Sequence, residues 1–162
     1  MAKELITNFG YEKILKEFKY LYETVKPYWV KEKQIAAQHG DRSENAEYIS
    51  AKEEIRNTDK RLRFLNRIIN NSDVIDISKI PHTKVNFGSK ITLLDFSTNK
   101  EKTFKIVGTH ETNPSENKIS NKSPLGRLLL GKEINEEFEF RINDNISEYE
   151  ILKIQECKME EL

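Results

Sequence analysis

The sequence predicts an α+β fold, in which an N-terminal antiparallel coiled-coil helical hairpin precedes a small antiparallel sheet domain that carries one helix. Two observations predict it. In the first half, apolar residues recur at alternating steps of three and four, which is typical of helices. After about Asn70, short β-rich runs alternate with turn-rich pieces such as "STNKE" and "ETNPSENK". We therefore place the two domains at residues 1–76 and 77–162.

The first helix is expected from about Tyr11 to Gln38, a length of about 42 Å at about 1.5 Å per residue. One of its seam positions holds Glu32, and the apolar seam positions are Tyr11, Ile14, Phe18, Leu21, Val25, Tyr28 and Ile35. Pro27 removes one backbone hydrogen bond from this helix. We expect a bend near Glu23 to Pro27 and no break, because the seam continues beyond the proline.

The second helix repeats the pattern, and its seam is Tyr48, Ala51, Ile55, Thr58, Leu62, Leu65 and Ile69. Two seams of this kind joined by a short connection indicate an antiparallel hairpin. The connection "HGDRSENAEY", residues 39–48, forms its tip. We expect Gly40 to be the C-cap of the first helix and either Asp41 or Ser43 to be the N-cap of the second.

Five β-rich runs in the second half predict the strands: "DVIDISKI", "SKITLLDF", "TFKIVGTH", "EFEFRI" and "YEILKIQE". A short helical stretch, Leu125 to Leu130, follows "NKSP" between the third and fourth runs. This order of elements predicts a small antiparallel sheet with one helix.

The composition narrows the class of protein. Charged residues make up 33% and hydrophobic residues 36% of the 162, which favours an elongated shape. The 27 basic and 27 acidic residues balance, so net charge indicates no nucleic-acid partner. Cys157 is the single cysteine, and no Cys/His cluster indicates zinc. No signal peptide or long apolar run is present, so we expect a cytoplasmic protein with no membrane contact.

The charges of the second helix are separated along its length. Asp41 to Glu54 hold five acids and two bases, whereas Ile55 to Asn70 hold five bases and one acid. The spacing of several bases places them on one helical face: Lys52, Arg56, Lys60, Arg63 and Arg67. Two interpretations remain open, a solvated face with local ion pairs and a track for a phosphate backbone.

Three carboxylates, Asp41, Glu44 and Glu47, lie at the tip. Acids at a helix N-terminus are ordinary capping and dipole chemistry. Mg²⁺ also takes oxygen ligands, often one or two protein carboxylates with waters and phosphates. Asp41 and Glu44 are three residues apart and can converge on one side, but two carboxylates form only half a site. A partner would have to supply the remaining ligands.

The stretches "GYEKILKEFKYL", "HGDRSENAEY" and "SPLGRLLLGK" resemble the Gre family of bacterial transcript-cleavage factors, over about Leu5 to Lys153. The tip followed by "IRNTDKRLRFL" is closer to the GreB branch than to the GreA branch. The resemblance implies an FKBP-like C-terminal domain and a hairpin that enters the secondary channel of bacterial RNA polymerase. It implies an accessory factor and not an enzyme, which stimulates the polymerase's own cleavage of backtracked RNA.

The resemblance also assigns residues by position. Asp41 and Glu44 match the tip acids that share a Mg²⁺ with the polymerase active site, and the chain holds no cofactor of its own. The basic patch that would hold the 3′ end of backtracked RNA is Lys52, Arg56, Lys60, Arg61, Arg63 and Arg67. The candidates for contact with polymerase are Ser43, Asn45, Ser123 and Pro124. We expect structural roles for Glu47 and Tyr48, and a monomer.

Two stretches depart from the family pattern: Asn121-Lys122 before the Ser-Pro and Ile134-Asn135 after the Gly-Lys. These changes leave the tip residues alone and affect the expected docking to polymerase and one turn of the C-terminal domain. Three alternatives remain. The first is a Gre-like channel plug that inhibits polymerase without cleavage. The second is a peptidyl-prolyl isomerase or chaperone, which needs an aromatic-lined pocket. The third is an RNA-binding coiled coil without a polymerase partner.

Overall fold

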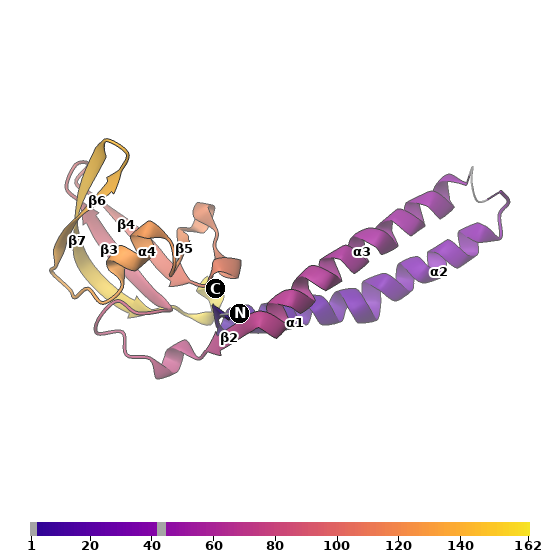
Figure 1. The fold of residues 1–162 in the computed structure, drawn as a ribbon, viewed down its shortest axis with the longest axis horizontal. Coiled ribbons are helices and arrows are strands. Elements are labelled where there is room, and N and C mark those ends of the chain that lie inside the picture. Colours follow the sequence, from indigo (N-terminus) through magenta and orange to yellow (C-terminus); the bar gives the residue numbers. More distant parts are fainter. Residues whose placement is uncertain (1–2, 42–44) are drawn as a thin grey trace. The chain divides into compact units, whose positions relative to one another are not determined.

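The computed structural model describes residues 3–41 and 45–162, which contain a helical hairpin and a sheet domain (Figure 1). Contacts within the chain divide it into two units. One unit is Tyr11–Asn71, and the other joins the residues up to Gly10 with Ser72–Leu162. The boundary predicted after residue 76 lies near the second junction, whereas the grouping of the N-terminal residues with the sheet domain has no counterpart in the sequence analysis.

The hairpin that the periodicity predicts is confirmed. Its helices are α1 (Asn8–Tyr20), α2 (Lys26–Ala37) and α3 (Ala46–Asn71), and α2 and α3 lie side by side (Figure 1). The buried residues of α3 recur at helical spacing: Ala51, Thr58, Leu62, Leu65 and Ile68. None of the helices in the described part of the chain is long and apolar enough to cross a membrane.

A π-helical turn, Leu21–Val25, joins α1 to α2. Pro27, which has no backbone N–H to donate, follows this turn as the second residue of α2, and the helix continues through it. A π turn contains one more residue than an α turn, so the face of the helix that packs moves by one position. Tyr28 is therefore 55% exposed and Ile35 is 41% exposed, while Ala36 is buried at 3%. The prediction that Tyr28 and Ile35 belong to the seam is wrong.

The main sheet has five strands in the order β5-β4-β3-β7-β6. Its strands are β3 (Ser89–Asp95), β4 (Lys100–Val107), β5 (Lys118–Ser120), β6 (Glu137–Ile142) and β7 (Asn145–Glu156). Neighbours pair antiparallel except β4 and β5, which pair parallel. Four of the five predicted runs therefore form strands of this sheet, and the sheet is antiparallel with one parallel edge.

The run "DVIDISKI" behaves differently from the prediction. Only its start belongs to a strand, β2 (Ser72–Ile75), and a 3-10 turn follows at Ile77–Lys79. β2 pairs in parallel with β1 (Glu4–Thr7), a strand that the sequence analysis did not predict. Because β1 and β2 are separated by the whole hairpin, no local pattern indicates that they pair.

Asparagines serve the turns of the sheet domain. Asn99, between β3 and β4, has a φ of 54°, and Asn143, between β6 and β7, has a φ of 55°. Asparagine tolerates this left-handed conformation better than most other residues. The asparagine-rich connections therefore have a structural explanation.

The core of the sheet domain lies between the sheet and the short helix α4 (Pro124–Leu129). It contains the fully buried Ile91 and Leu93 of β3 and Leu129 of α4. Aromatic side chains of this half also contribute, with Phe87, Phe138 and Tyr149 buried in the same cluster. These three rings therefore pack as core.

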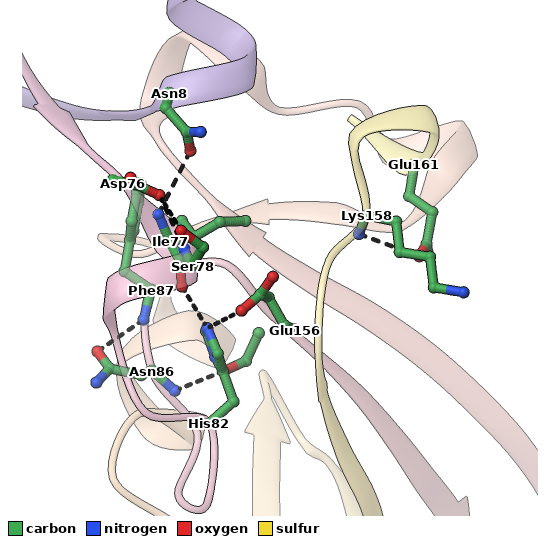
Figure 2. A network of polar contacts seen from close by, with 11 residues as sticks. Asn8, Asp76, Ile77, Ser78, His82, Asn86, Phe87, Glu156, Lys158 and Glu161 are labelled. Carbon is green, nitrogen blue, oxygen red and sulfur yellow. Dashed lines mark hydrogen bonds and ion pairs between the residues drawn. The ribbon is translucent and has the colours of Figure 1, made fainter.

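A second set of contacts holds the segment before β3 in place. Figure 2 shows His82 between the carbonyl of Ile77 and the carboxylate of Glu156. The His82 Nε2–H donates to that carbonyl at 2.9 Å, and Nδ1 lies 2.6 Å from the Ser89 hydroxyl. Both ring nitrogens therefore have partners, and His82 is a structural residue.

Candidate functional site

The residues that cap the end of α2 and the start of α3 differ from the prediction. The C-cap of α2 is Gln38, and Gly40 lies beyond it in the loop with a φ of +128°. α3 begins at Ala46, and the carbonyl oxygen of the Asn45 side chain accepts a hydrogen bond from the Tyr48 N–H at 3.1 Å. Asn45 is thus the N-cap, and not Asp41 or Ser43.

Asn45 also reaches the other helix. Its side-chain amide donates to the backbone carbonyl of Ala36 at 2.6 Å. Asparagine carries a donor and an acceptor on one short side chain, whereas aspartate has no donor. This explains why Asn45 fits a position that must serve both helices. The interaction expected between Asn45 and polymerase stays a prediction, and within the chain its side chain shapes the tip.

Asp41 lies exposed at the tip. It borders an open depression of about 550 Å³ that is lined by His39, Asp41, Asn45, Ala46 and Glu47. The carboxylates of Asp41 and Glu47 thus border one solvent-filled space. Ser43 and Glu44 lie outside the described residues.

The tip can supply part of a Mg²⁺ site. Carboxylate oxygens are the ligands that Mg²⁺ takes, and the ion usually keeps several waters and adds phosphate oxygens. Among residues 3–41 and 45–162, no group of three or more His, Cys, Asp or Glu side chains gathers to hold a metal ion. The donor set present, with Asp41 at an open tip, fits an ion whose other ligands come from another molecule.

The predicted basic residues form an exposed stripe along α3. We define the basic stripe as Lys52, Arg56, Lys60, Arg63 and Arg67, all of which are exposed. Arg56 lies 3.7 Å from Glu53, a contact between two exposed groups that is worth little. In the part of the chain that the structure describes, the other four form no ion pair.

The acid best placed to neutralise this stripe is used elsewhere. The Asp59 carboxylate lies 2.7 Å from the Lys26 Nζ on α2. The interpretation of the stripe as a face of local ion pairs is met only in part, because Arg56 contacts Glu53 along α3 whereas Asp59 pairs across the hairpin. The positive charge of the stripe is therefore left for other partners.

Arg61 differs from the other predicted bases. Its Nε and Nη2 donate to the two carboxylate oxygens of Glu17 on α1 at 2.9 and 3.0 Å. Such a two-point arrangement is the strong form of an arginine–carboxylate contact. Arg61 therefore connects the two arms of the hairpin.

Phe64 is a candidate that the charge and apolar patterns of the sequence did not indicate. The Arg61 guanidinium lies 5.2 Å from the centre of the Phe64 ring, and that of Arg67 lies 6.0 Å from it. Both distances suit cation–π contact. The spacing of three residues on either side of the aromatic ring is the signal that could have found this cluster.

The second candidate surface lies at α4. The Ser123 hydroxyl caps this helix, because it accepts from the Gly126 N–H at 3.0 Å and donates to the Ser120 carbonyl at 2.7 Å. Pro124, the first residue of α4, is exposed. Of the two docking candidates here, Pro124 is exposed, whereas Ser123 is half-buried and its hydroxyl is hydrogen-bonded within the domain.

Lys122 and Asn135, one residue from each departure from the family pattern, have partners in the sheet domain. The Lys122 Nζ lies 2.8 Å from the Glu4 carboxylate, and this hydrogen bond lowers the pKa of Glu4. Asn135 has a φ of 71°, and its N–H donates to the Ile151 carbonyl at 2.7 Å.

Cys157 is buried, and burial raises the pKa of its thiol to about 12. The thiol is therefore protonated at neutral pH and is not a nucleophile.

Comparison with known proteins gives consistent matches over most of the chain. The family model described as "Transcription elongation factor, GreA/GreB, C-term" matches residues 80–156, and that described as "Transcription elongation factor, N-terminal" matches residues 4–74. The transcription elongation factor GreA of Helicobacter hepaticus is 41% identical over 154 residues, which cover 95% of this chain and 94% of that protein. GreA of Nitratiruptor sp. is 43% identical over 152 residues, or 94% and 93% of the two chains.

Both relatives are named GreA, so the expected closeness to the GreB branch is not supported. The dense basic run on α3 therefore does not distinguish the two branches here. Among solved structures, the transcription factor Gfh1 aligns over 95% of this chain and 99% of its own, with a TM-score of 0.46 and 22% identity. A likeness at this level supports no argument about this chain.

Proposed function

Because the chain belongs to the GreA/GreB family of transcription elongation factors, we propose that its hairpin enters the secondary channel of RNA polymerase and stimulates cleavage of backtracked RNA. The polymerase's own active site cuts the RNA, and the chain acts as an accessory factor. A hairpin completes its own helix pairing within one chain, so we expect a monomer to be the active form.

The observation that carries this proposal is the exposed Asp41 beside a loop that Asn45 braces. Asn45 ties the last turn of α2 to the first turn of α3, close to Asp41 in the chain. A carboxylate held on such a support reaches a reaction centre in another molecule with little loss of entropy. This is the geometry that assistance to a foreign active site requires.

In the complex, Asp41 and Glu44 would hold a Mg²⁺ that the polymerase active site shares. Bound there, the ion would lower the pKa of its water and stabilise the negative charge that develops on the phosphate. The chain's own contribution is to bring two carboxylates to one place and to orient them. Glu47, one helical turn further on, remains a structural residue of the first turn of α3.

The basic stripe is the proposed track for the extruded RNA. Its lysines and arginines would contact phosphates and not bases, so binding should weaken with salt and ignore sequence. Arg61 matches the family's basic patch by position, but its contact with Glu17 reserves it for the hairpin. Pro124 is the docking residue that we propose on the sheet domain, beside the capping Ser123, while Ser43 is proposed from position alone.

The test of the tip uses stalled, backtracked polymerase complexes. Asp41→Asn and Glu44→Gln should each nearly abolish cleavage while binding to polymerase persists, because each removes a charged ligand without removing bulk. Glu47→Gln is the matched control and should cleave as the unmodified chain does. Normal cleavage by both of the first two variants would refute the metal role. Binding without any cleavage by the unmodified chain would favour the channel-plug alternative.

The test of the track compares RNA extruded by a short and by a long stretch. Changing Arg56, Lys60 and Arg63 together to Ala should chiefly impair cleavage of the long extrusion. The triple change should also weaken the salt dependence of RNA binding. The slope of the logarithm of the binding constant against the logarithm of the salt concentration should fall by roughly 0.7 for each phosphate that the variant no longer neutralises. Arg61→Ala is the control, which should lower hairpin stability and leave the length dependence unchanged. Equal impairment on both extrusions by the triple variant would count against the track.

A further inference from the structure

Phe64 is a large apolar side chain that stays 39% exposed within a cationic surface. It follows Lys60 by four residues and precedes Arg67 by three, so all three lie on one side of α3. The ring therefore lies alongside the basic stripe. An aromatic ring among cations, open to solvent, is the combination that single-stranded nucleic-acid sites use.

The two arginines that contact the ring are not equivalent. Glu17 holds the Arg61 guanidinium through two hydrogen bonds, so Arg61 stays fixed 5.2 Å from the ring centre. Arg67 lies further away, at 6.0 Å, and forms no ion pair with any residue that the structure describes. Of the two arginine contacts, that of Arg61 is thus anchored and that of Arg67 can be exchanged.

We propose that Phe64 is a stacking platform for a base of the extruded single-stranded RNA, an inference that rests on the proposed function. The base takes the place of the Arg67 guanidinium over the ring, and Arg67 moves to an adjacent phosphate. Arg61 keeps its two hydrogen bonds to Glu17. Because every base has a π face, this contact is independent of sequence, as the phosphate contacts of the stripe are.

The position of Phe64 sets a length requirement. It lies 18 residues after Ala46 on the continuous helix α3, which is about 27 Å at about 1.5 Å per residue. At a stacked spacing of about 3.4 Å per nucleotide, that distance takes about eight nucleotides, and a stretched strand needs fewer. Only RNA extruded by several nucleotides beyond the tip reaches the ring.

The experiment measures how much of each variant is needed for half-maximal cleavage of complexes whose RNA is extruded by about two or about twelve nucleotides. Phe64→Leu keeps apolar bulk and removes the aromatic face, and Phe64→Tyr is the matched control that keeps it. We expect Phe64→Leu to require about tenfold more protein on the long extrusion and no more on the short one, since removal of one base–aromatic stack costs about that much. Phe64→Tyr should match the unmodified chain on both.

A second measurement separates stacking from hairpin stability. A single abasic nucleotide is moved along the long extruded RNA. At one position the abasic nucleotide should raise the concentration of the unmodified chain needed for half-maximal cleavage to that of Phe64→Leu. The concentration needed for Phe64→Leu itself should not change. No such position, or an impairment of Phe64→Leu that is equal on both extrusions, would overturn the proposal. If Phe64→Leu unfolds the hairpin, the abasic series with the unmodified chain decides alone. Failure of the unmodified chain to stimulate cleavage in either complex would instead refute the proposed function.

Discussion

The Asn45 side-chain amide donates a 2.6 Å hydrogen bond to the Ala36 backbone carbonyl, nine residues earlier in the chain. The same side chain accepts from the Tyr48 N–H at 3.1 Å. Helix ends leave such carbonyls and N–H groups without partners in the helix itself. One asparagine therefore satisfies a group in the last turn of α2 and a group in the first turn of α3, directly beside the loop that carries Asp41.

Asn45→Ala should lower the free energy of unfolding of the hairpin by about 1 kcal/mol, because it removes an N-cap and one hydrogen bond to the Ala36 carbonyl, which keeps the His39 N–H as a donor. The measurement is thermal unfolding followed by the helical circular dichroism of the full chain. Asn45→Asp is the control, because it keeps the N-cap and removes only the amide donor. Its stability should lie between that of the unmodified chain and that of Asn45→Ala. Unchanged melting of Asn45→Ala would contradict the bridging role.

The π turn makes a prediction about two neighbouring residues of α2. Ala36 is buried, so Ala36→Leu should overpack the contact with α3 and cost about 1–3 kcal/mol. Ile35 is exposed, so Ile35→Ala should change stability by no more than about 0.5 kcal/mol. Urea unfolding of both variants checks this order. A larger destabilisation by Ile35→Ala would restore the register expected from the unbroken heptad.

Gly10 depends on a carboxylate from a distant turn. The Glu111 side chain accepts from the Thr7 N–H at 3.0 Å and the Gly108 N–H at 2.9 Å, and it also contacts the Thr7 hydroxyl. A Cβ at Gly10 would overlap this carboxylate. Gly10→Ala should therefore destabilise the sheet domain by about 1–3 kcal/mol.

A double-mutant cycle identifies the cause. In a Glu111→Ala background the overlap is gone, so Gly10→Ala should be neutral or stabilising by up to about 1 kcal/mol, as expected of alanine in a helix. Denaturant unfolding of the four proteins gives the coupling. Equal costs of Gly10→Ala in both backgrounds would mean that the carboxylate is not what excludes a side chain.

Asp95 should make the sheet domain sensitive to acid. It is buried at the end of β3, and the hydrogen bond from the Ser97 hydroxyl, at 2.7 Å, lowers its pKa, with Lys102 at 3.2 Å acting in the same direction. The unfolded chain, where this pKa is about 3.9, then binds more protons near that pH. The ionised Asp95 carboxylate therefore contributes its full stabilisation of the fold above the pKa of the unfolded chain. This contribution is lost as the pH falls through the lower pKa of the folded chain.

The measurement is urea unfolding of the unmodified chain and Asp95→Asn at about pH 6 and about pH 3. The unmodified chain should be the more stable of the two at the higher pH, and the difference should shrink at the lower one. A difference that does not change with pH would show that the charge of Asp95 contributes nothing to folding.

Local patterns predicted a large part of this protein. Heptad spacing indicated both arms of the hairpin, and alternating apolar residues indicated strands such as β3 and β7. The exposed positions of Lys60 and Arg63 also followed from spacing alone. Such features involve residues within a few positions of one another, so their periodicity is written directly in the chain.

The seam of α2 shows where this method stops. One extra residue in the turn at Leu21–Val25 moved the packing face of α2 by one position, so Ala36 packs where Ile35 was expected. An α-helix and a π turn have nearly the same local composition requirements. The choice between them depends on how the two arms fit together along their length.

The sequence by itself determined the hairpin, its acidic tip, its basic stripe and the strand-rich second half, because each depends on neighbours a turn or a pleat apart. Only the tertiary structure decided that β1 pairs with β2, that Asp59 turns to Lys26 and that Glu17 holds Arg61. These partners are tens of residues apart. Many groups in the chain are equally charged or equally apolar. The packing of whole helices and strands decides which of them meet, and no short stretch of sequence contains that information.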